Sequence, residues 1–159
     1  MACRMEAGDI AIHHWPDLDR LVPARAPIEP ALVFPPCALA LQPLIDLPDP
    51  FSRAVQRLLP EDLVPRYAAV RKNIRCHGIP DDIQHYCSFS KLLGWPALVQ
   101  WHDLDSLEDG TRLLLQVDDY ANGQELHGWG PGGSLYFVIR DKDLQMRRFD
   151  RCEFEIQFT

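Results

Sequence analysis

The clearest pattern in the chain is an alternation of apolar and polar residues near its C-terminal end. Residues 152–158 place apolar side chains on one side of an extended strand and polar side chains on the other: Cys152, Phe154, Ile156 and Phe158 against Glu153, Glu155 and Gln157. Because successive side chains of a strand point to opposite faces, we expect the apolar face to lie in the core and the polar face in water.

Two further segments have the composition of strands. Residues 111–118 and 134–140 are rich in apolar, β-branched or aromatic residues and are bounded by Gly, Pro or Asp. The connections between the strands are too short for the crossover helices that a parallel sheet needs. We therefore predict an antiparallel sheet within residues 88–159.

Helical spacing replaces alternation between residues 49 and 76. Asp49 and Pro50 are the residue types of an N-cap and a first helical position, and apolar residues follow at helical spacing: Phe51, Ala54, Val55, Leu58 and Leu59. A second helix is expected to carry Pro65 in its first turn and to present one apolar face, formed by Leu63, Tyr67, Val70 and Ile74, with Arg66, Arg71 and Lys72 elsewhere on its surface. The sequence thus predicts two short amphipathic helices in the middle of the chain.

Proline dominates the part of the chain before these helices. Ten of the fourteen prolines fall within the first sixty residues, and proline fixes φ and removes a backbone donor. Residues 1–48 are therefore predicted to form an extended, irregular arm that wraps the domain. The whole pattern predicts one α+β domain spanning residues 1–159, a length sufficient to bury a single core.

Charge narrows the classes of partner. The net charge is −7, which disfavours nucleic acid because affinity for a phosphate backbone comes largely from Lys and Arg. The acidity is concentrated after residue 90, where seven basic residues face twelve acidic ones, against nine and eleven before it. A basic partner would suit that second half.

The sequence also bears on the cellular compartment. Its apolar stretches are shorter than the roughly eighteen residues that span a bilayer, and its N-terminus lacks the features of a secretory signal. We expect a cytoplasmic protein without membrane association. The five cysteines are odd in number and scattered, so we expect free thiols at Cys3, Cys37, Cys76, Cys87 and Cys152.

Candidate metal ligands lack the spacing of a metal site. Four soft-metal ligand types lie close together in the sequence, but without the paired spacing of a tetrahedral zinc site: Cys76, His77, His85 and Cys87. An acidic segment from Asp103 has Leu107 and Glu108 where a calcium loop needs an oxygen ligand and glycine. We expect no metal, no cofactor and no catalytic constellation.

A glycine-rich segment runs from Gly128 to Gly133. It matches the glycine spacing of a dinucleotide-binding loop, but Pro131 removes a donor amide and the pattern predicts a strand after it rather than a helix. A turn that leads the chain into a strand is the preferred interpretation.

Aromatic residues beside acidic ones make the best candidate surface for a protein partner. Rigid rings supply buried area, and charges supply orientation and association rate. The contact residues that we predict are Asp103, Asp105, Asp118, Asp119, Tyr120, Glu125 and His127. Trp95 and Trp129 are expected instead to cover the ends of the sheet.

Four motifs in the second half resemble the C-terminal part of the bacterial YwqG-like family. They are SKLLGWPALVQ at 90–100, LLLQVD at 113–118, GWGPGGSLYFVI at 128–139 and RRFDRCEFEIQ at 147–157. The resemblance covers residues 88–159 and implies a shortened member, because the family's chains are generally longer and have a β-rich N-terminal half. Ser90, Tyr120 and Pro131 stand where polar residues are common in the family, so the resemblance carries over no catalytic residue.

The resemblance implies a function in binding. Some members of that family lie near toxin genes, which suggests immunity proteins that bind and occlude a toxin. We therefore expect a non-enzymatic protein-binding domain, in its specific form an immunity protein that neutralises a basic toxin. One alternative is a small-ligand or metal-dependent enzyme that uses Asp118, His127 and the turn from Gly128 to Gly133. Another is a homodimer formed through an exposed sheet edge.

Overall fold

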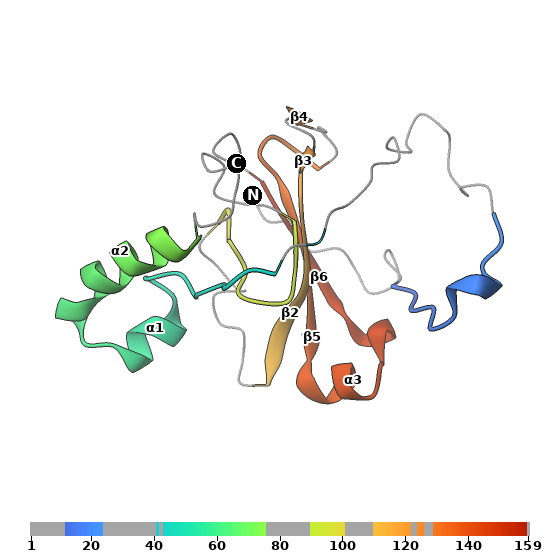
Figure 1. Cartoon of the computed structure of the whole chain (residues 1–159), viewed down its shortest axis with the longest axis horizontal. Coiled ribbons are helices and arrows are strands. Elements are labelled where there is room, and N and C mark those ends of the chain that lie inside the picture. The colour runs from blue at the N-terminus through green and yellow to red at the C-terminus, as the bar shows by residue number, and fades with distance from the viewer. Residues whose placement is uncertain are drawn as a thin grey trace.

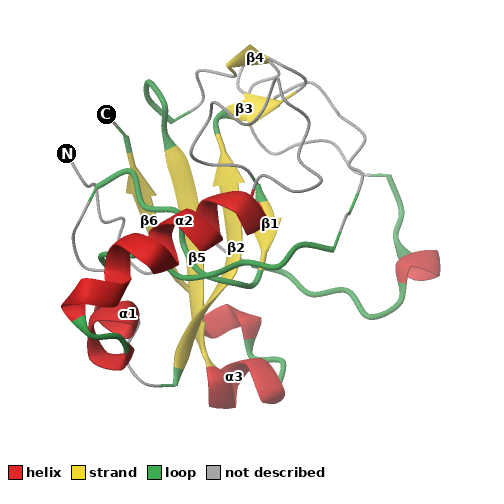
Figure 2. Ribbon diagram, turned by 60° about the vertical axis from the view of Figure 1, so that its left-hand side comes forward, coloured by secondary structure: helices red, strands yellow, loops and turns green. Residues whose placement is uncertain are grey.

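Four antiparallel strands form the main sheet (Figures 1 and 2). The computed structural model describes residues 12–23, 41, 43–75, 90–100, 110–121, 124–125 and 129–158. In them the sheet has the order β1-β2-β5-β6, with strands β1 (Lys91–Leu92), β2 (Thr111–Asp118), β5 (Ser134–Arg140) and β6 (Glu153–Gln157). The predicted α+β class, with an antiparallel sheet in the second half, is confirmed.

The pairing register gathers polar side chains on one face of the sheet. Gln116 of β2 lies opposite Tyr136 of β5, and Ser134 lies opposite both Asp118 and Gln157. None of these five residues is more than 6% exposed. The polar positions of the strands therefore point into the interior rather than into water.

A small hydrophobic cluster continues the same face. Leu113 and Val138 are paired in the register and pack with the ring of Tyr136, and Leu98 covers them from the segment before β2. The core thus lies between this face of the sheet and the 95–100 segment.

The opposite face of the sheet is mainly apolar and, apart from Ile139 at 1% exposure, only partly buried. Phe137 and Phe154 are register partners whose ring centroids lie 5.0 Å apart, and Ile156 is also partly exposed. The predicted alternation in residues 152–158 is correct, but its assignment of the wet face is wrong at Gln157, which is 0% exposed. The reason is that a neighbouring segment covers the polar face and requires hydrogen-bond acceptors from it.

Both predicted helices are present, with a different start for the first. Helix α1 (Arg53–Leu58) begins after Ser52, whose hydroxyl accepts the N–H of Val55 at 3.4 Å, so Ser52 is the N-cap. Asp49 instead accepts the N–H of Phe51 through its side chain and belongs to the preceding turn. Helix α2 (Val64–Arg75) has Pro65 in its first turn, as predicted.

The face that α2 turns inward differs from the predicted one. Tyr67 and Ile74 are partly buried, but Val70 is 47% exposed and the short 3-10 helix η3 (Glu61–Leu63) leaves Leu63 41% exposed. Arg71 takes the inward position instead, with its side chain 14% exposed. The predicted apolar stripe is thus replaced in part by a guanidinium that makes hydrogen bonds.

The helices and the sheet lie in successive layers. Figures 1 and 2 show α1 and α2 on one side of the main sheet, with the 43–49 segment and the 95–100 segment between them and the strands. Hydrogen bonds link each layer to the next, from Tyr67 of α2 to Pro48, from Asp46 to Trp95, and from Ala97 to Gln116.

Elements that the pattern did not predict lie in the connections. The β5–β6 connection contains α3 (Asp141–Gln145) and the 3-10 helix η5 (Phe149–Arg151), and strands β3 (Tyr120–Ala121) and β4 (Gln124–Glu125) form a separate two-stranded sheet. In the described part of the predicted arm, the 3-10 helix η1 (Leu18–Arg20) is the regular element. The ring of His14 lies 4.8 Å from that of Phe149, which ties this arm to the β5–β6 connection.

Candidate functional site

The predicted contact residues fall into two groups. Asp118 and Asp119 lie at the end of β2 and are 6% and 1% exposed, so the structure buries both carboxylates. Tyr120 and Glu125 are register partners in the small β3–β4 sheet next to them. Asp103, Asp105 and His127 lie outside the described residues. The described members are therefore gathered at one end of β2, but two of them are interior residues.

The glycine-rich turn lies beside these two carboxylates. The N–H of Asp119 donates to the carbonyl of Gly133 at 3.0 Å, and the chain then enters β5. The predicted turn is confirmed in residues 129–133. Gly130 has a φ of +96°, and a Cβ on Gly133 would lie 2.7 Å from the carbonyl oxygen of Trp129, so this turn needs glycine.

Three buried polar side chains from three adjacent strands bind the backbone of the 97–100 segment. The amide oxygen of Gln116 accepts the N–H of Ala97 at 2.9 Å. The amide oxygen of Gln157 accepts the N–H groups of Val99 at 3.1 Å and Gln100 at 2.9 Å. These contacts satisfy amides that a segment outside any strand would otherwise leave unpaired in the interior.

The hydroxyl of Tyr136 completes this arrangement. It donates to the carbonyl of Ala97 at 2.7 Å and accepts the N–H of Val99 at 3.3 Å. Burial, more than the nearby carboxylates of Asp118 and Glu155, raises the pKa of Tyr136 to about 12. The phenol is therefore neutral at physiological pH and acts as a structural donor rather than as a base.

The sequence interpretation missed these three residues for identifiable reasons. The pattern places Gln157 on the wet face because it alternates with the apolar residues of its strand. Tyr136 lies within a strand segment rich in apolar and aromatic residues, where nothing in the sequence singles out its hydroxyl. The available signal was Gln116, an amide inside the otherwise apolar run LLLQV of the central strand β2. A polar side chain at such a position needs a buried partner.

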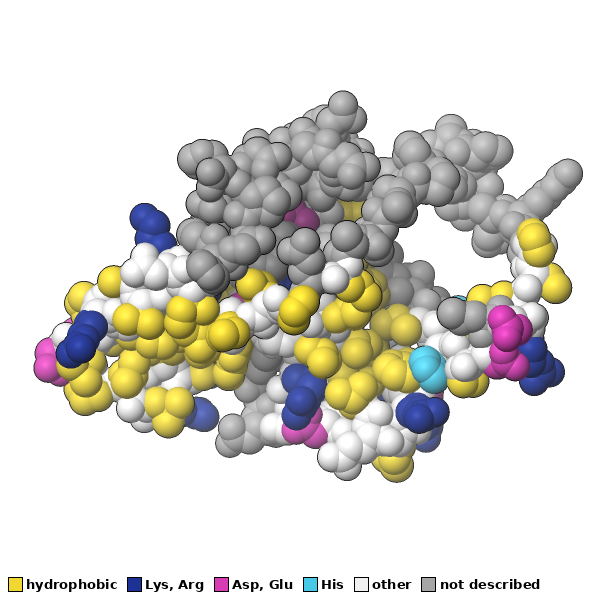
Figure 3. Space-filling model, in the orientation of Figure 1, with side chains coloured by type: hydrophobic (Ala, Val, Ile, Leu, Met, Phe, Trp, Pro, Cys, Tyr) yellow, Lys and Arg dark blue, Asp and Glu magenta, His cyan; other side chains and the backbone are white. Residues whose placement is uncertain are grey.

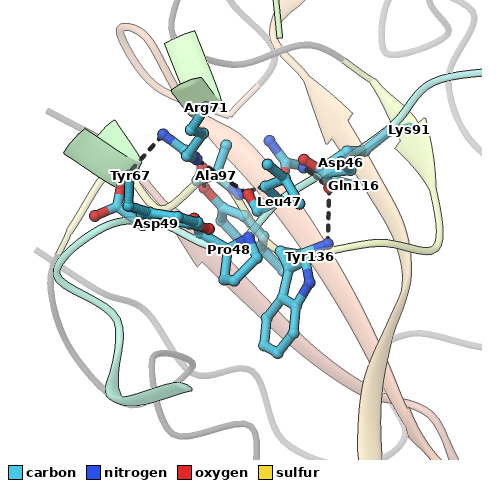
Figure 4. A network of polar contacts seen from close by, with 11 residues as sticks. Asp46, Leu47, Pro48, Asp49, Tyr67, Arg71, Lys91, Ala97, Gln116 and Tyr136 are labelled. Carbon is cyan, nitrogen blue, oxygen red and sulfur yellow. Dashed lines mark hydrogen bonds and ion pairs between the residues drawn. The ribbon is translucent and has the colours of Figure 1, made fainter. Parts of the chain in front are cut away.

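A second network joins the helices to the edge of the sheet through the 46–49 segment. Figure 4 shows Asp46 beside Lys91, whose ammonium nitrogen lies 2.8 Å from the Asp46 carboxylate. The same carboxylate accepts the N–H of Trp95 at 2.8 Å. Gly94 has a φ of +82°, and a Cβ there would overlap Asp46 Oδ2. The turn before Trp95 therefore requires glycine for two reasons.

Helix α2 holds the other end of this segment. The hydroxyl of Tyr67 donates to the carbonyl of Pro48 at 2.8 Å, and Arg71 Nε donates to the carbonyl of Leu47 at 3.0 Å. Arg71 also lies 3.5 Å from the carboxylate of Asp49. Polar contacts, rather than a broad apolar face, thus attach α2 to the 46–49 segment.

This mode of attachment leaves an apolar surface exposed on the helical unit, residues 51–75. Figure 3 shows hydrophobic side chains gathered over α1 and α2. We call the exposed apolar set the helical surface; its members are Phe51 at 63%, Leu58 at 80%, Leu63 at 41% and Val70 at 47% exposure. Val55, at 3%, is the buried member of the predicted α1 face.

Other candidate chemistry is limited in the described residues. Burial raises the pKa of the Cys152 thiol to about 11, with a smaller contribution from Asp150, so the thiol is protonated and a weak nucleophile at neutral pH. No cluster of three metal-ligand types occurs among the residues that the structure describes. Cys76, His77, His85 and Cys87 lie outside those residues. None of the described helices is long and apolar enough to cross a membrane.

Comparison with known protein families gives a match over most of the chain. A family model described as a domain of unknown function (DUF1963) matches residues 43–157. This range begins just before the 46–49 segment and ends at the last residue of β6, so it contains both hydrogen-bonded networks and the helical surface. No curated protein and no solved structure matches the chain.

Proposed function

The chain belongs to the DUF1963 family, and we propose that it is a protein-binding domain that meets its partner through the helical surface. The observation that carries this proposal is the exposure of four large apolar side chains on one helical unit, with Leu58 at 80%. Exposed apolar groups that gather on one surface favour association, because a partner that covers them stabilises the complex by about 25 cal/mol per Å² of apolar area removed from water.

The way the helical unit is anchored supports a binding role. Ser52 caps α1, and Arg71 and Tyr67 hold α2 by hydrogen bonds to backbone carbonyls. The backbone beneath the helical surface is therefore fixed before any partner arrives. Such preorganisation reduces the ordering cost that opposes association.

Selection from a phage-displayed library of random peptides tests this proposal. The full chain should enrich peptides that bind it and fail to bind a Leu58→Ser, Val70→Ser double variant. Met146→Ser is the matched control, because Met146 is 60% exposed near the end of α3, away from the helical unit. If no enriched peptide depends on Leu58 and Val70, the proposal is wrong.

The resemblance to the YwqG-like family suggests a specific kind of protein binding, which is immunity to a bacterial toxin. We propose both the relationship to that family and the immunity function. Glu125 and Tyr120 remain candidate contacts for a basic toxin, whereas Asp118 and Asp119, at 6% and 1% exposure, offer it little contact area. Co-expression with the product of a neighbouring toxin gene should restore growth. Growth arrest that the chain does not relieve would count against immunity.

A small-ligand site at the end of β2 is the second candidate function. It is favoured by the juxtaposition of two buried carboxylates, Asp118 and Asp119, with Ser134 and the glycine-rich turn. A screen of metal ions and small metabolites by thermal denaturation tests it. A ligand site at this position predicts that some compound raises the melting temperature of the native chain but not that of the Asp118→Asn variant. If no compound does so, this candidate function is wrong.

A further inference from the structure

The helical unit is the basic part of an acidic protein. Residues 51–75 contain six Lys or Arg and two Asp or Glu, whereas the rest of the chain contains ten and twenty-one. Dividing the chain into halves conceals this contrast, because the basic helices and an acidic arm fall in the same half. The local charge is thus opposite in sign to the net charge of −7.

The basic side chains lie at the edge of the helical surface. Arg53 opens α1, and Arg66 and Lys72 belong to α2; all three are exposed. Arg66 and Val70 are four residues apart and therefore neighbours on the helix. Figure 3 shows Lys and Arg side chains at the margins of the apolar surface over α1 and α2. Arg71 is excluded from this set because it is engaged with Leu47 and Asp49.

We call the exposed basic side chains at the edge of the helical surface the basic margin. Two acidic residues interrupt it. Glu61 and Asp62 lie in η3, between the two helices, and are exposed. Positive charge therefore borders the helical surface along α1 and α2 but not at the η3 turn. A partner with carboxylates placed opposite Arg53 and Arg66 would match this distribution.

We propose that the helical surface binds an acidic amphipathic segment of a partner protein. The partner's apolar side chains would pack on Leu58 and Val70, and its carboxylates would lie opposite the basic margin. This inference rests on the proposed function and adds the chemistry of the partner. A polyanion such as nucleic acid or an anionic membrane is disfavoured, because its extended charge would also meet the acidic remainder of the chain. The basic partner predicted for the second half would meet a different surface.

The same library selection tests the partner's chemistry. Peptides that depend on Leu58 and Val70 should be enriched in Asp and Glu together with Leu, Ile or Phe. Binding of such a peptide, followed by fluorescence anisotropy, should weaken at least about tenfold at low salt in an Arg53→Glu, Arg66→Glu double variant. Lys142→Glu, an exposed charge reversal in α3, should leave it unchanged.

The outcomes separate this inference from the proposed function. Surface-dependent peptides that are neutral or basic would overturn the acidic partner while leaving protein binding intact. The absence of any surface-dependent peptide would remove both. A last experiment uses vesicles of phosphatidylcholine and phosphatidylserine. If the native chain binds these vesicles and the Arg53→Glu, Arg66→Glu double variant does not, a membrane rather than an acidic protein segment is the partner, and the inference is wrong.

Discussion

Tyr136 joins the hydrophobic cluster to the hydrogen-bonded network on the same face of the sheet. Its ring packs with Leu113 and Val138, while its hydroxyl donates to the Ala97 carbonyl and accepts the Val99 N–H. One side chain therefore supplies both apolar burial and polar satisfaction. Removing the hydroxyl alone separates the two contributions.

Tyr136→Phe should lower the free energy of unfolding by about 1–2 kcal/mol near neutral pH, because it keeps the ring and leaves the Ala97 carbonyl without this donor. Urea denaturation measures the effect. A stability equal to that of the native chain would mean that the hydroxyl contributes nothing to holding the 97–100 segment.

The stability difference between the native chain and Tyr136→Phe should depend on pH. The folded-state pKa of Tyr136 is raised to about 12 from the ordinary 10.0. The stabilisation by the neutral hydroxyl is therefore fully present below pH 10 and is lost as pH rises toward the folded pKa. The difference in stability between native chain and Tyr136→Phe should shrink over that interval. A difference that stays constant would contradict the raised pKa.

Gly94 illustrates a backbone requirement that is decided by a neighbouring side chain. Gly94→Ala should be more destabilising than Gly110→Ala, by about 1 kcal/mol or more. Both glycines have positive φ, +82° and +86°, but a Cβ at Gly110 meets nothing within 4 Å whereas one at Gly94 overlaps Asp46. Equal losses in thermal denaturation would show that the contact with Asp46 has no cost.

At the scale of elements, α2 is held by its polar side chains. Helical periodicity correctly predicted its existence and the position of Pro65, because these depend on local spacing and on the fixed φ of proline. Its inward face was not predictable in the same way. An apolar stripe indicates a buried face only when the neighbouring element is apolar, and here the neighbour is the backbone of residues 47–48, which requires donors.

Arg71→Met should destabilise the chain by about 1–3 kcal/mol, because it removes the hydrogen bond to Leu47 and the ion pair with Asp49. Arg66→Met is the control in the same helix. Its side chain is exposed, so its effect should stay within about 0.5 kcal/mol. Urea denaturation and the rate of protease cleavage within residues 43–75 measure both. Equal effects of the two variants would refute the anchoring role of Arg71.

At the scale of the whole molecule, the described networks and the hydrophobic cluster fall within residues 43–158, which nearly coincides with the family match. Residues 12–23 contribute the ring contact between His14 and Phe149. The unit formed by the helices, the 46–49 segment and the main sheet therefore has its own internal contacts.

A chain of residues 43–159 should accordingly fold and unfold cooperatively, with a loss of about 1 kcal/mol or less from the absent His14 contact. Thermal denaturation with far- and near-ultraviolet circular dichroism tests this. Loss of the near-ultraviolet signal would show that residues 1–42 are needed for the packing of the core. A homodimer through the sheet edge remains a prediction, which light scattering on the full chain would decide.

The sequence by itself determined the features that depend on local pattern. Alternation and residue type located β2, β5 and β6, helical spacing located α1 and α2, and the glycines with the following apolar run located the turn into β5. Each of these follows from side-chain period and backbone freedom within a few residues. The basic character of residues 51–75 was also available from the sequence, at a finer division than halves.

Only the tertiary structure decided which faces are buried. Gln116, Tyr136 and Gln157 became interior residues because the 97–100 segment lies across their strands and brings amides that need partners. Leu58 and Val70 became exposed because the helices are attached through Arg71 and Tyr67 instead. Burial is a property of what lies opposite a residue, and that neighbour comes from a distant part of the chain.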